Sequence, residues 1–432
     1  MFAARRQRFR EAMEPGSIAL FVGARTLVRS GDTEFPFRQD SDFWYLTGFG
    51  QPDAVAVLRA EGDPGFTLFV LPRDPGAKTW TGYRPGTEGA IADYGADAAF
   101  PVASLKERLP GLLEGVTRIH HSLGRDTALD ANILAVLDDQ RRRSRTGVVP
   151  PSEIVDPRAR LHEMRLRKEP REIECMRRAA AITAAAHQGA ARIAQGGRFE
   201  YELQAELEYA FRRLGGSGPA YGSIVGGGQN ATVLHYIAND QPLRDGDLVL
   251  IDAGVEFEGY AADVTRTYPV GGRFEGYARA VYEVVLAAQE AALAACRPGT
   301  DLDAIHEGTL RSLVEGMIDL GFFEGPVDAA IEAERFRPYY MHRTSHWLGL
   351  DVHDVGSYSR DGKPRPLEAG MAFTVEPGLY VPMNSPDPGS EAFRGIGVRI
   401  EDDVIVTESG IENLNRAIPK QIEALEAWVR GD

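Results

Sequence analysis

Short apolar runs alternate with helical patterns along the first 150 residues. Runs of β-branched and aromatic residues bounded by Gly, Pro or Asp predict strands, whereas apolar residues recurring every three or four positions predict helices. We therefore expect strands at residues 18–22, 54–59, 66–71 and 118–120, and helices at residues 2–14, 103–109 and 131–143. Such an alternation is typical of an α/β domain.

Prolines interrupt this pattern at Pro150-Pro151 and Asp156-Pro157, which indicates a domain boundary. We therefore expect an α/β N-terminal domain over residues 1–155 and a second domain over residues 156–432. In the second domain, a helical pattern covers residues 163–195 with a restart at Pro170, and another helix covers residues 200–214. Gly226, Gly227 and Gly228 predict a turn before a strand at residues 231–236.

Residues 248–268 have the pattern of a β-hairpin, with two β-rich runs on either side of Glu256-Phe257-Glu258-Gly259. If Phe257 and Glu258 are the loop residues, Asp252 lies directly across from Asp263. Like charges at such positions, about 5 Å apart, destabilise a sheet. A divalent cation between the carboxylates would remove the repulsion, because hard cations take oxygen ligands. The alternative is that one Asp is a solvated turn residue.

An internal duplication adds two more acidic residues. Residues 242–254 (P-L-R-D-G-D-L-V-L-I-D-A-G) are repeated at residues 366–378 (P-L-E-A-G-M-A-F-T-V-E-P-G), which places Glu376 on Asp252. Residues 397–403 alternate as a strand, and pairing with the Glu376 strand would place Glu401 where Asp263 sits in the first half. We therefore expect an α+β domain with an internal pseudo-two-fold duplication and a ligand site between its halves.

Four converging carboxylates determine the expected number of metal ions. One divalent ion would leave about two buried negative charges, whereas two ions balance all four, which predicts a dinuclear centre. Three histidines fall within residues 341–354, and of these we assign His346 as a metal ligand and His353 as a substrate-facing group. An ordinary hydrogen-bonded histidine is the alternative for both of them, and for His342 as well. An oxygen-rich ligand set favours Mn²⁺, although Zn²⁺ or Co²⁺ could bind.

Composition narrows the partners and the compartment. The net charge of -15 argues against nucleic acid as a partner, because phosphate binding requires clustered Lys and Arg. No run approaches the roughly 20 apolar residues that span a bilayer, and we expect no membrane association. Two cysteines, Cys175 and Cys296, give no disulfide framework, which fits a reducing cytoplasm.

Five motifs carry a resemblance to a known family. They are S-D-F-W-Y-L-T-G-F at residues 41–49, H-E-M-R-L at residues 162–166, and, further on, S-H-W-L-G-L-D-V-H-D-V-G, T-V-E-P-G-L-Y and G-I-G-V-R-I-E-D-D. With these motifs the chain resembles the creatinase, or "pita-bread", family of dinuclear metallopeptidases. Within that family it is most similar to the Xaa-Pro aminopeptidases (aminopeptidase P). The resemblance covers nearly the whole chain.

The resemblance implies a role for each site residue. Asp252 would bind one metal, His346 and Glu376 the other, and Asp263 and Glu401 both. Glu376 is also the candidate proton shuttle. Further residues match the substrate-binding or catalytic positions of the family: His235, His342, His353 and Arg399. By motif position, the substrate wall would include Asp32, Trp80 and Tyr221, with Trp80 acting across a subunit contact. For these three, a loop Asp or an aromatic core residue is the alternative.

The implied activity is hydrolysis of the bond between a first residue and a proline in second position, by a hydroxide that bridges the two metals. The partners would be peptides with proline second and further copies of the chain, as a homo-oligomer (dimer or tetramer). The nearest alternative is a prolidase that cleaves only Xaa-Pro dipeptides, and a catalytically silent peptide-binding relative is a second. Arg343 departs from the small residue often found in the M-H-x-x-S-H motif.

Overall fold

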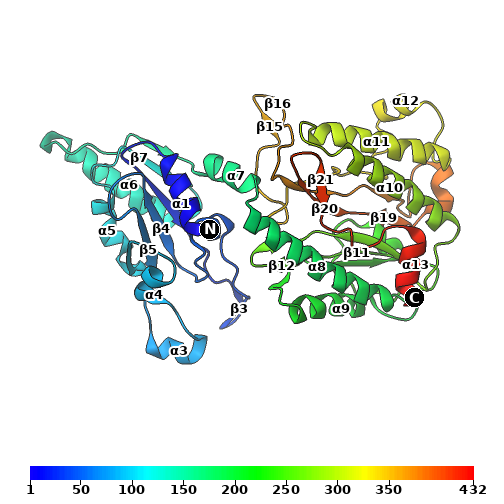
Figure 1. Ribbon diagram of the computed structural model, residues 1–432, viewed down its shortest axis with the longest axis horizontal. Coiled ribbons are helices and arrows are strands. Elements are labelled where there is room, and N and C mark those ends of the chain that lie inside the picture. Colours follow the sequence, from blue (N-terminus) through cyan, green and yellow to red (C-terminus); the bar gives the residue numbers. More distant parts are fainter. The chain divides into compact units, whose positions relative to one another are not determined.

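The computed structural model describes residues 1–432, the side chain of Ala77 excepted, and the chain forms two compact units, Met1–Glu163 and Met164–Asp432 (Figure 1). The division falls inside α7 (Arg158–Leu166), whereas we placed the boundary before this helix, after residue 155. None of the helices among the described residues combines the length and the apolar character needed to cross a bilayer.

The N-terminal unit is built on a six-stranded mixed sheet with the order β6-β5-β4-β1-β7-β8. Its strands are β1 (Ser17–Val22), β4 (Val55–Arg59), β5 (Phe66–Val70), β6 (Ala98–Pro101), β7 (Arg118–His121) and β8 (Glu153–Val155), and a separate small ribbon joins β2 (Val28–Ser30) to β3 (Thr33–Glu34). The helices are α1 (Phe2–Glu11), α2 (Ser41–Thr47), α3 (Pro75–Thr81), α4 (Gly86–Ala92), α5 (Leu105–Leu112) and α6 (Thr127–Arg142). The expected strands and helices of this region are all present, with shifted bounds for the helices. The elements β6, β8, α2, α3 and α4 were not expected from the sequence.

Apolar side chains from the sheet and two helices form the core of the N-terminal unit. Ile18, Val57 and Phe69 are buried against Leu109 of α5 and Ile133 of α6. Burial of such side chains removes apolar area from water and stabilises the layered arrangement.

Two helix pairs frame the strands of the C-terminal unit. α8 (Pro170–Arg192) packs on α9 (Glu200–Arg213), and α10 (Gly276–Ala295) packs on α11 (Leu302–Asp319). Three strands lie between the two pairs in this view: β11 (Leu248–Asp252), β19 (Gly397–Arg399) and β20 (Asp402–Val406) (Figure 1). The remaining helices are α12 (Val327–Glu332) and α13 (Ile422–Arg430). The restart at Pro170 is confirmed, because this residue opens α8 after the break that follows α7.

The strands of this unit are short and form several small sheets. They are β9 (Gly218–Pro219), β10 (Ile224–Gly227), β11 (Leu248–Asp252), β12 (Val255–Phe257), β13 (Tyr260–Ala261), β14 (Thr265–Pro269), β15 (Ser359–Arg360), β16 (Lys363–Pro364), β17 (Ala372–Val375), β18 (Gly378–Tyr380), β19 (Gly397–Arg399), β20 (Asp402–Val406) and β21 (Ile411–Asn413). The expected strand at residues 231–236 is wrong: the chain forms the 3₁₀ turn η3 (Gly228–Thr232) there. Gly226 and Gly227, expected in a turn, belong to β10, where a Cβ on Gly226 would meet the Asn230 backbone at 2.9 Å.

The register of the first hairpin differs from the expected one. Asp252 pairs with Thr265, and Phe257 pairs with Tyr260, so Glu258 and Gly259 form the turn. These two residues have φ of 49° and 86°, the positive values that a tight two-residue hairpin turn requires. Glycine adopts such a conformation without strain, whereas Phe257 in the loop would not. Asp263 therefore lies diagonally across from Asp252, not directly opposite.

The second hairpin shows the duplication and corrects one correspondence. Val375 pairs with Asp402 and Gly378 with Arg399, so Glu376 falls opposite Glu401 in register. Since Asp252 falls opposite Thr265 in the first half, Glu401 corresponds to Thr265. The expectation that Glu401 occupies the place of Asp263 is wrong. That place belongs to Arg399, and the two halves thus contribute opposite charges at equivalent positions.

Candidate metal centre

A cavity of about 660 Å³ in the C-terminal unit brings the predicted ligands together. All five line it, and three of the histidines proposed for catalysis line it too. The lining residues are Leu234, His235, Asp252, Asp263, Leu302, Asp303, His342, Arg343, Ser345, His346, His353, Tyr358, Glu376, Arg399 and Glu401. The convergence expected from the sequence is therefore observed, although the ligand roles themselves remain predictions.

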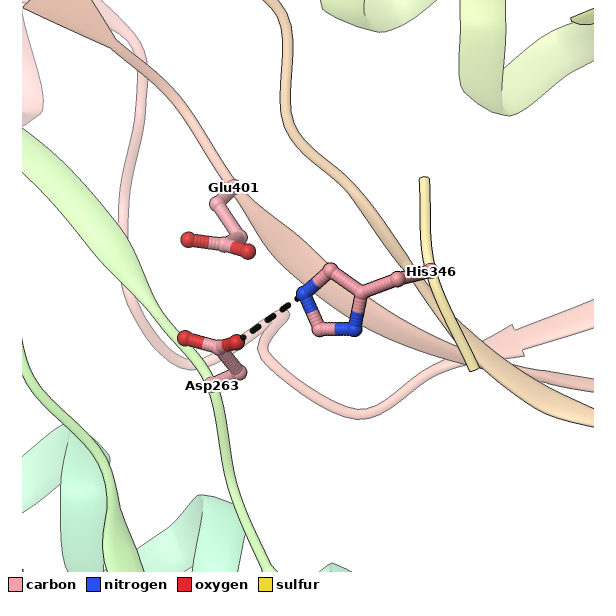
Figure 2. Close-up of side chains that lie close together, drawn as sticks. All are labelled: Asp263, His346 and Glu401. Atoms are coloured by element: carbon pink, nitrogen blue, oxygen red, sulfur yellow. Dashed lines mark ion pairs between the residues drawn. The ribbon is translucent and has the colours of Figure 1, made fainter. Parts of the chain in front are cut away.

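Three of these side chains are close enough to share one metal ion. Asp263, His346 and Glu401 each offer a ligand atom, and the three atoms lie within 4.8 Å of one another (Figure 2). His346 Nε2 is 3.3 Å from Asp263 Oδ2 and 3.5 Å from Glu376 Oε1. His346 Nδ1 contacts the Trp347 carbonyl at 3.0 Å, so the other ring nitrogen is left to face the carboxylates, as in many metal-binding histidines.

The four carboxylates stand where the strand pairing is interrupted. Asp252 ends β11, Asp263 lies between β13 and β14, Glu376 between β17 and β18, and Glu401 between β19 and β20. At the first interruption the backbones approach so closely that a Cβ on Gly254 would lie 1.8 Å from the Ala262 carbonyl oxygen. Glycine is required there, and the close crossing directs both aspartates toward the same space.

The carboxylates of the cluster have too few positive partners within the protein, and their pKa values reflect this. Burial disfavours the charged form of each carboxylate. It raises the pKa of Glu376 to about 7, with further increases from Asp263 and Asp252, and it raises the pKa of Glu401 well above its usual value. Burial also raises the pKa of Asp252, partly offset by Arg399. For Asp263, burial is outweighed by the hydrogen bond to His346, so its pKa is lowered. The same contact outweighs burial at His346 and raises its pKa to about 9.

The residues present fit divalent cations. Arg399 bonds to Asp252 at 2.5 Å, and its other nitrogens contact Tyr380 and Thr265 at 3.0 Å each. Together with His346 this supplies two positive charges for four carboxylates, of which Asp252, Asp263 and Glu401 are buried and Glu376 is partly exposed. The remaining negative charge and the oxygen-rich donor set match what hard divalent ions require.

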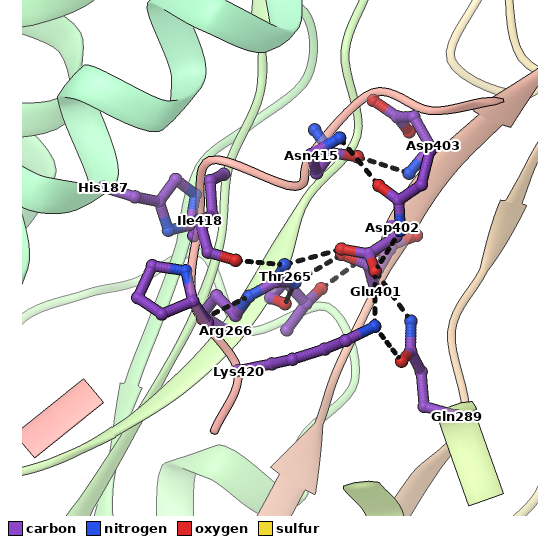
Figure 3. A network of polar contacts seen from close by, with 12 residues as sticks. His187, Thr265, Arg266, Gln289, Glu401, Asp402, Asp403, Asn415, Ile418 and Lys420 are labelled. Atoms are coloured by element: carbon purple, nitrogen blue, oxygen red, sulfur yellow. Dashed lines mark hydrogen bonds and ion pairs between the residues drawn. The ribbon is translucent and has the colours of Figure 1, made fainter. Parts of the chain in front are cut away.

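Behind the cluster lies a second polar network that the sequence reasoning missed (Figure 3). The buried Arg266 donates to the Glu401 carbonyl at 2.6 Å and to Asp402 Oδ1 at 2.5 Å. Lys420 Nζ lies 2.9 Å from Asp402 Oδ2 and 2.6 Å from Gln289 Oε1. The sequence holds two indications of this network. Arg266 interrupts the apolar and hydroxyl residues of β14, and Asp402 and Asp403 follow Glu401 directly. This network fixes the backbone that carries Glu401.

The other predicted histidines and Tyr221 have distinct surroundings. The His342 ring contacts the Tyr380 hydroxyl at 2.9 Å and the Arg343 carbonyl at 2.8 Å, and burial lowers its pKa to about 3, so it is neutral. The His353 ring centre lies 4.4 Å from that of His346. Tyr221 donates its hydroxyl hydrogen to Asp252 at 2.6 Å. Each of them is therefore connected to the cavity directly or through a ligand.

A buried ion triad anchors the segment that carries His353. Asp354 bonds to Lys168 Nζ at 2.8 Å and to Arg165 at 2.5 Å, and a Cβ on Gly349 would lie 2.2 Å from its carboxylate. The H-E-M-R-L motif thus contributes Arg165 to the support of the candidate site. Neither Arg165 nor Lys168 was singled out from the sequence.

Two predicted substrate-wall residues belong to the other unit. Asp32 lies in the turn between β2 and β3, and Trp80 lies in α3 and is 87% exposed. Their roles remain predictions.

Comparisons with known proteins assign both units of the chain to one group of peptidases. Residues 174–408 match the model of metallopeptidase family M24, and residues 2–120 match that of the aminopeptidase P N-terminal domain. An Escherichia coli K12 protein named Xaa-Pro aminopeptidase is 45% identical, covering 99% of this chain and 96% of its own. Xaa-Pro aminopeptidase 3 of Mus musculus is 36% identical, with 93% and 78% covered.

Solved structures show the same fold. The Pseudomonas aeruginosa aminopeptidase PepP superposes with a TM-score of 0.96 at 45% identity, covering 100% of this chain and 97% of its own. An E. coli aminopeptidase P variant in complex with substrate gives a TM-score of 0.95 at 44% identity, covering 100% and 98%. The predicted fold class and the family resemblance are confirmed.

Proposed function

We propose that this chain, which belongs to metallopeptidase family M24, hydrolyses the bond between an N-terminal residue and a proline that follows it, and so releases the first residue. The observation that carries this proposal is the convergence of Asp252, Asp263, His346, Glu376 and Glu401 in one cavity. The names of its close relatives, Xaa-Pro aminopeptidases at up to 45% identity over 99% of the chain, support the same activity.

The five converging residues would hold two divalent ions. When bound, such ions supply Lewis-acid polarisation of the scissile carbonyl and a water of lowered pKa. A ligand set of four carboxylates and one imidazole favours Mn²⁺ over metals that prefer sulfur or nitrogen ligands. His346 must lose its Nε2 proton on metal binding, and its contact with the Trp347 carbonyl keeps the Nδ1 proton in place.

The residues of the chain would orient the peptide and handle its protons. Glu376 lines the cavity and would accept a proton from the attacking water at a carboxylate oxygen and return it to the departing proline nitrogen. His353 and His235 line the cavity and would donate hydrogen bonds to the oxygen of the scissile carbonyl as charge develops. Arg399 holds the Asp252 carboxylate in one orientation.

A comparison of two peptides tests the proposal. The purified chain, loaded with Mn²⁺, is expected to release the first residue from an Xaa-Pro-Xaa tripeptide and to leave an Xaa-Ala-Xaa tripeptide intact, as followed by mass spectrometry. Cleavage of Xaa-Pro dipeptides alone would identify a prolidase instead. Absence of any cleavage together with metal bound at the site would favour a silent peptide-binding relative.

Three finer expectations belong to the same proposal. Manganese as the resident metal is supported by the oxygen-rich donor set. A reducing cytoplasmic location is supported by the two cysteines, Cys175 and Cys296, which are buried and unbridged. A homo-oligomer, with Trp80 acting across a subunit contact, remains a prediction that ultracentrifugation would test.

A further inference from the structure

We infer that Arg343, ion-paired with Asp303 at the cavity wall, selects peptides that carry a carboxylate beyond the proline. This inference rests on the proposed function and names a preference among its substrates. The carboxylate would come from the C-terminus of a short peptide or from an acidic side chain in the third position.

Arg343 and Asp303 line the same cavity as the metal-ligand candidates. Arg343 lies in the loop that leads to His346, and Asp303 lies in the first turn of α11. Arg343 Nη2 bonds to Asp303 Oδ1, and the two side chains are 59% and 51% exposed. The pair is therefore part of the cavity wall and also accessible from solvent.

An exposed ion pair of this kind exchanges partners at low cost. Such pairs contribute little to stability in water, so a substrate carboxylate can replace Asp303 as the partner of Arg343. A guanidinium also presents several N–H donors in a fixed plane, which match the two oxygens of a carboxylate.

The other cationic groups of the cavity are already committed. The nitrogens of Arg399 bond to Asp252, Tyr380 and Thr265, and that side chain is buried. His346 faces Asp263 and Glu376. Two divalent ions would neutralise the four ligand carboxylates, so Arg343 is the cation left to bind an anionic group of the substrate.

The direction in which the peptide binds determines which of its groups reaches Arg343. An enzyme that releases the first residue holds the amino end at the reacting centre, so the chain beyond the proline extends toward the cavity wall and solvent. The free end of that part is a carboxylate.

Ratios of kcat/KM within one enzyme variant test the inference. We compare Xaa-Pro-Glu-Xaa with Xaa-Pro-Gln-Xaa, and tripeptides with free and amidated C-termini, using Mn²⁺-loaded wild type, Arg343→Gln and Asp303→Asn. The wild type should prefer one or both carboxylate-bearing peptides by about three- to fivefold, as expected for an exposed charge pair. Arg343→Gln should bring that ratio close to one, and Asp303→Asn should increase it.

A matched control separates this effect from a change in overall charge. Arg311 and Asp328 form an ion pair of similar exposure, 50% and 73%, outside the cavity lining. Arg311→Gln should keep the wild-type ratios. The glutamate arm and the C-terminal arm distinguish the two sources of the carboxylate.

Equal ratios in wild type and Arg343→Gln would overturn the inference while the proposed function stands. A preference for lysine in the third position that disappears in Asp303→Asn would overturn it too, because the aspartate would then be the selecting group. If the wild type cleaves no peptide with proline second, the proposed function itself fails.

Discussion

Two buried carboxylates on adjacent residues, Glu401 and Asp402, have opposite electrostatic surroundings. Their residues are 2% and 1% exposed. Glu401 faces the cavity, where burial and the neighbouring carboxylates raise its pKa well above the usual value. Asp402 faces the opposite way, where Arg266 and Lys420 outweigh burial and lower its pKa far below the usual value. The cavity cluster has fewer positive groups than carboxylates and is electrostatically incomplete, whereas Asp402 has two cationic partners and its network is complete in charge.

The difference distinguishes charges that stabilise the fold from charges that are available to bind a ligand. Buried carboxylates are costly unless they are paired, so the complete network around Asp402 is explained by its own contacts. The incomplete cluster is not stable as a fully ionised set, and it requires either protons or cations from outside. Arg266 links the two, because it bonds to Asp402 and to the backbone of Glu401.

The largest expected effect comes from removing a shared ligand. Asp263→Asn should lower kcat/KM by about a thousandfold or more, because metal-derived stabilisation of several kcal/mol is lost. Metal content, measured by mass spectrometry of the dialysed protein, should fall as well. Asp328→Asn, at an exposed position outside the cavity, is the matched control. Near wild-type turnover in Asp263→Asn would refute the role of this residue.

The complete network should instead respond in stability. Arg266→Met leaves Asp402 with Lys420 as its remaining cationic partner, so we expect a loss of stability below the roughly 3–5 kcal/mol that a buried charge without any partner costs. Faster hydrogen exchange is expected in peptides from β14 and β20. In the double variant Arg266→Met/Asp402→Asn the two losses should be less than additive, since the ion pair between these residues can be removed only once. Strictly additive losses would contradict the pairing argument.

Metal removal should lower the stability of the folded protein through the cavity cluster and not through the network around Asp402. A ligand that binds only the folded state stabilises it by about 2.7 kcal/mol at one hundred times its Kd. We expect the melting temperature of wild type to fall when Mn²⁺ is replaced by a chelator. In Asp263→Asn the same treatment should change it much less. Equal shifts in the two proteins would show that the stabilising metal binds elsewhere.

The sequence predicted the members of the incomplete cluster better than their pairing. Acidic residues in repeated motifs identified Asp252, Asp263, Glu376 and Glu401, because chemistry restricts residue types. The register was missed by one turn position, since the choice between Phe257-Glu258 and Glu258-Gly259 depends on backbone conformation. Arg266 and Asp402 were missed because a buried pair has no sequence spacing that marks it: its partners are brought together only by the fold.

The most gradual expected effect is a pH dependence of opposite sign in the two clusters. In the metal-free protein the pKa of Glu376 is raised from 4.5 to about 7, so the folded state binds more protons than the unfolded state between these values. The stability that this provides is present below pH 4.5 and is lost as pH rises toward 7. His346, with its pKa raised to about 9, continues the loss above pH 6.5. The lowered pKa of Asp402 acts the other way, and its contribution is lost only in acid, below its usual value of 3.8.

Urea unfolding of the chelated protein between pH 5 and pH 7.5 measures this dependence. One group with a raised pKa contributes a decrease of up to about 1.4 kcal/mol per pH unit in the free energy of unfolding. Glu376→Gln should make the decrease shallower, because one titrating group is removed. Loading with Mn²⁺ should abolish most of it, since bound ligands are already deprotonated. Stability that rises with pH in this range for the metal-free protein would contradict the assignment of the uncompensated charge to the cavity.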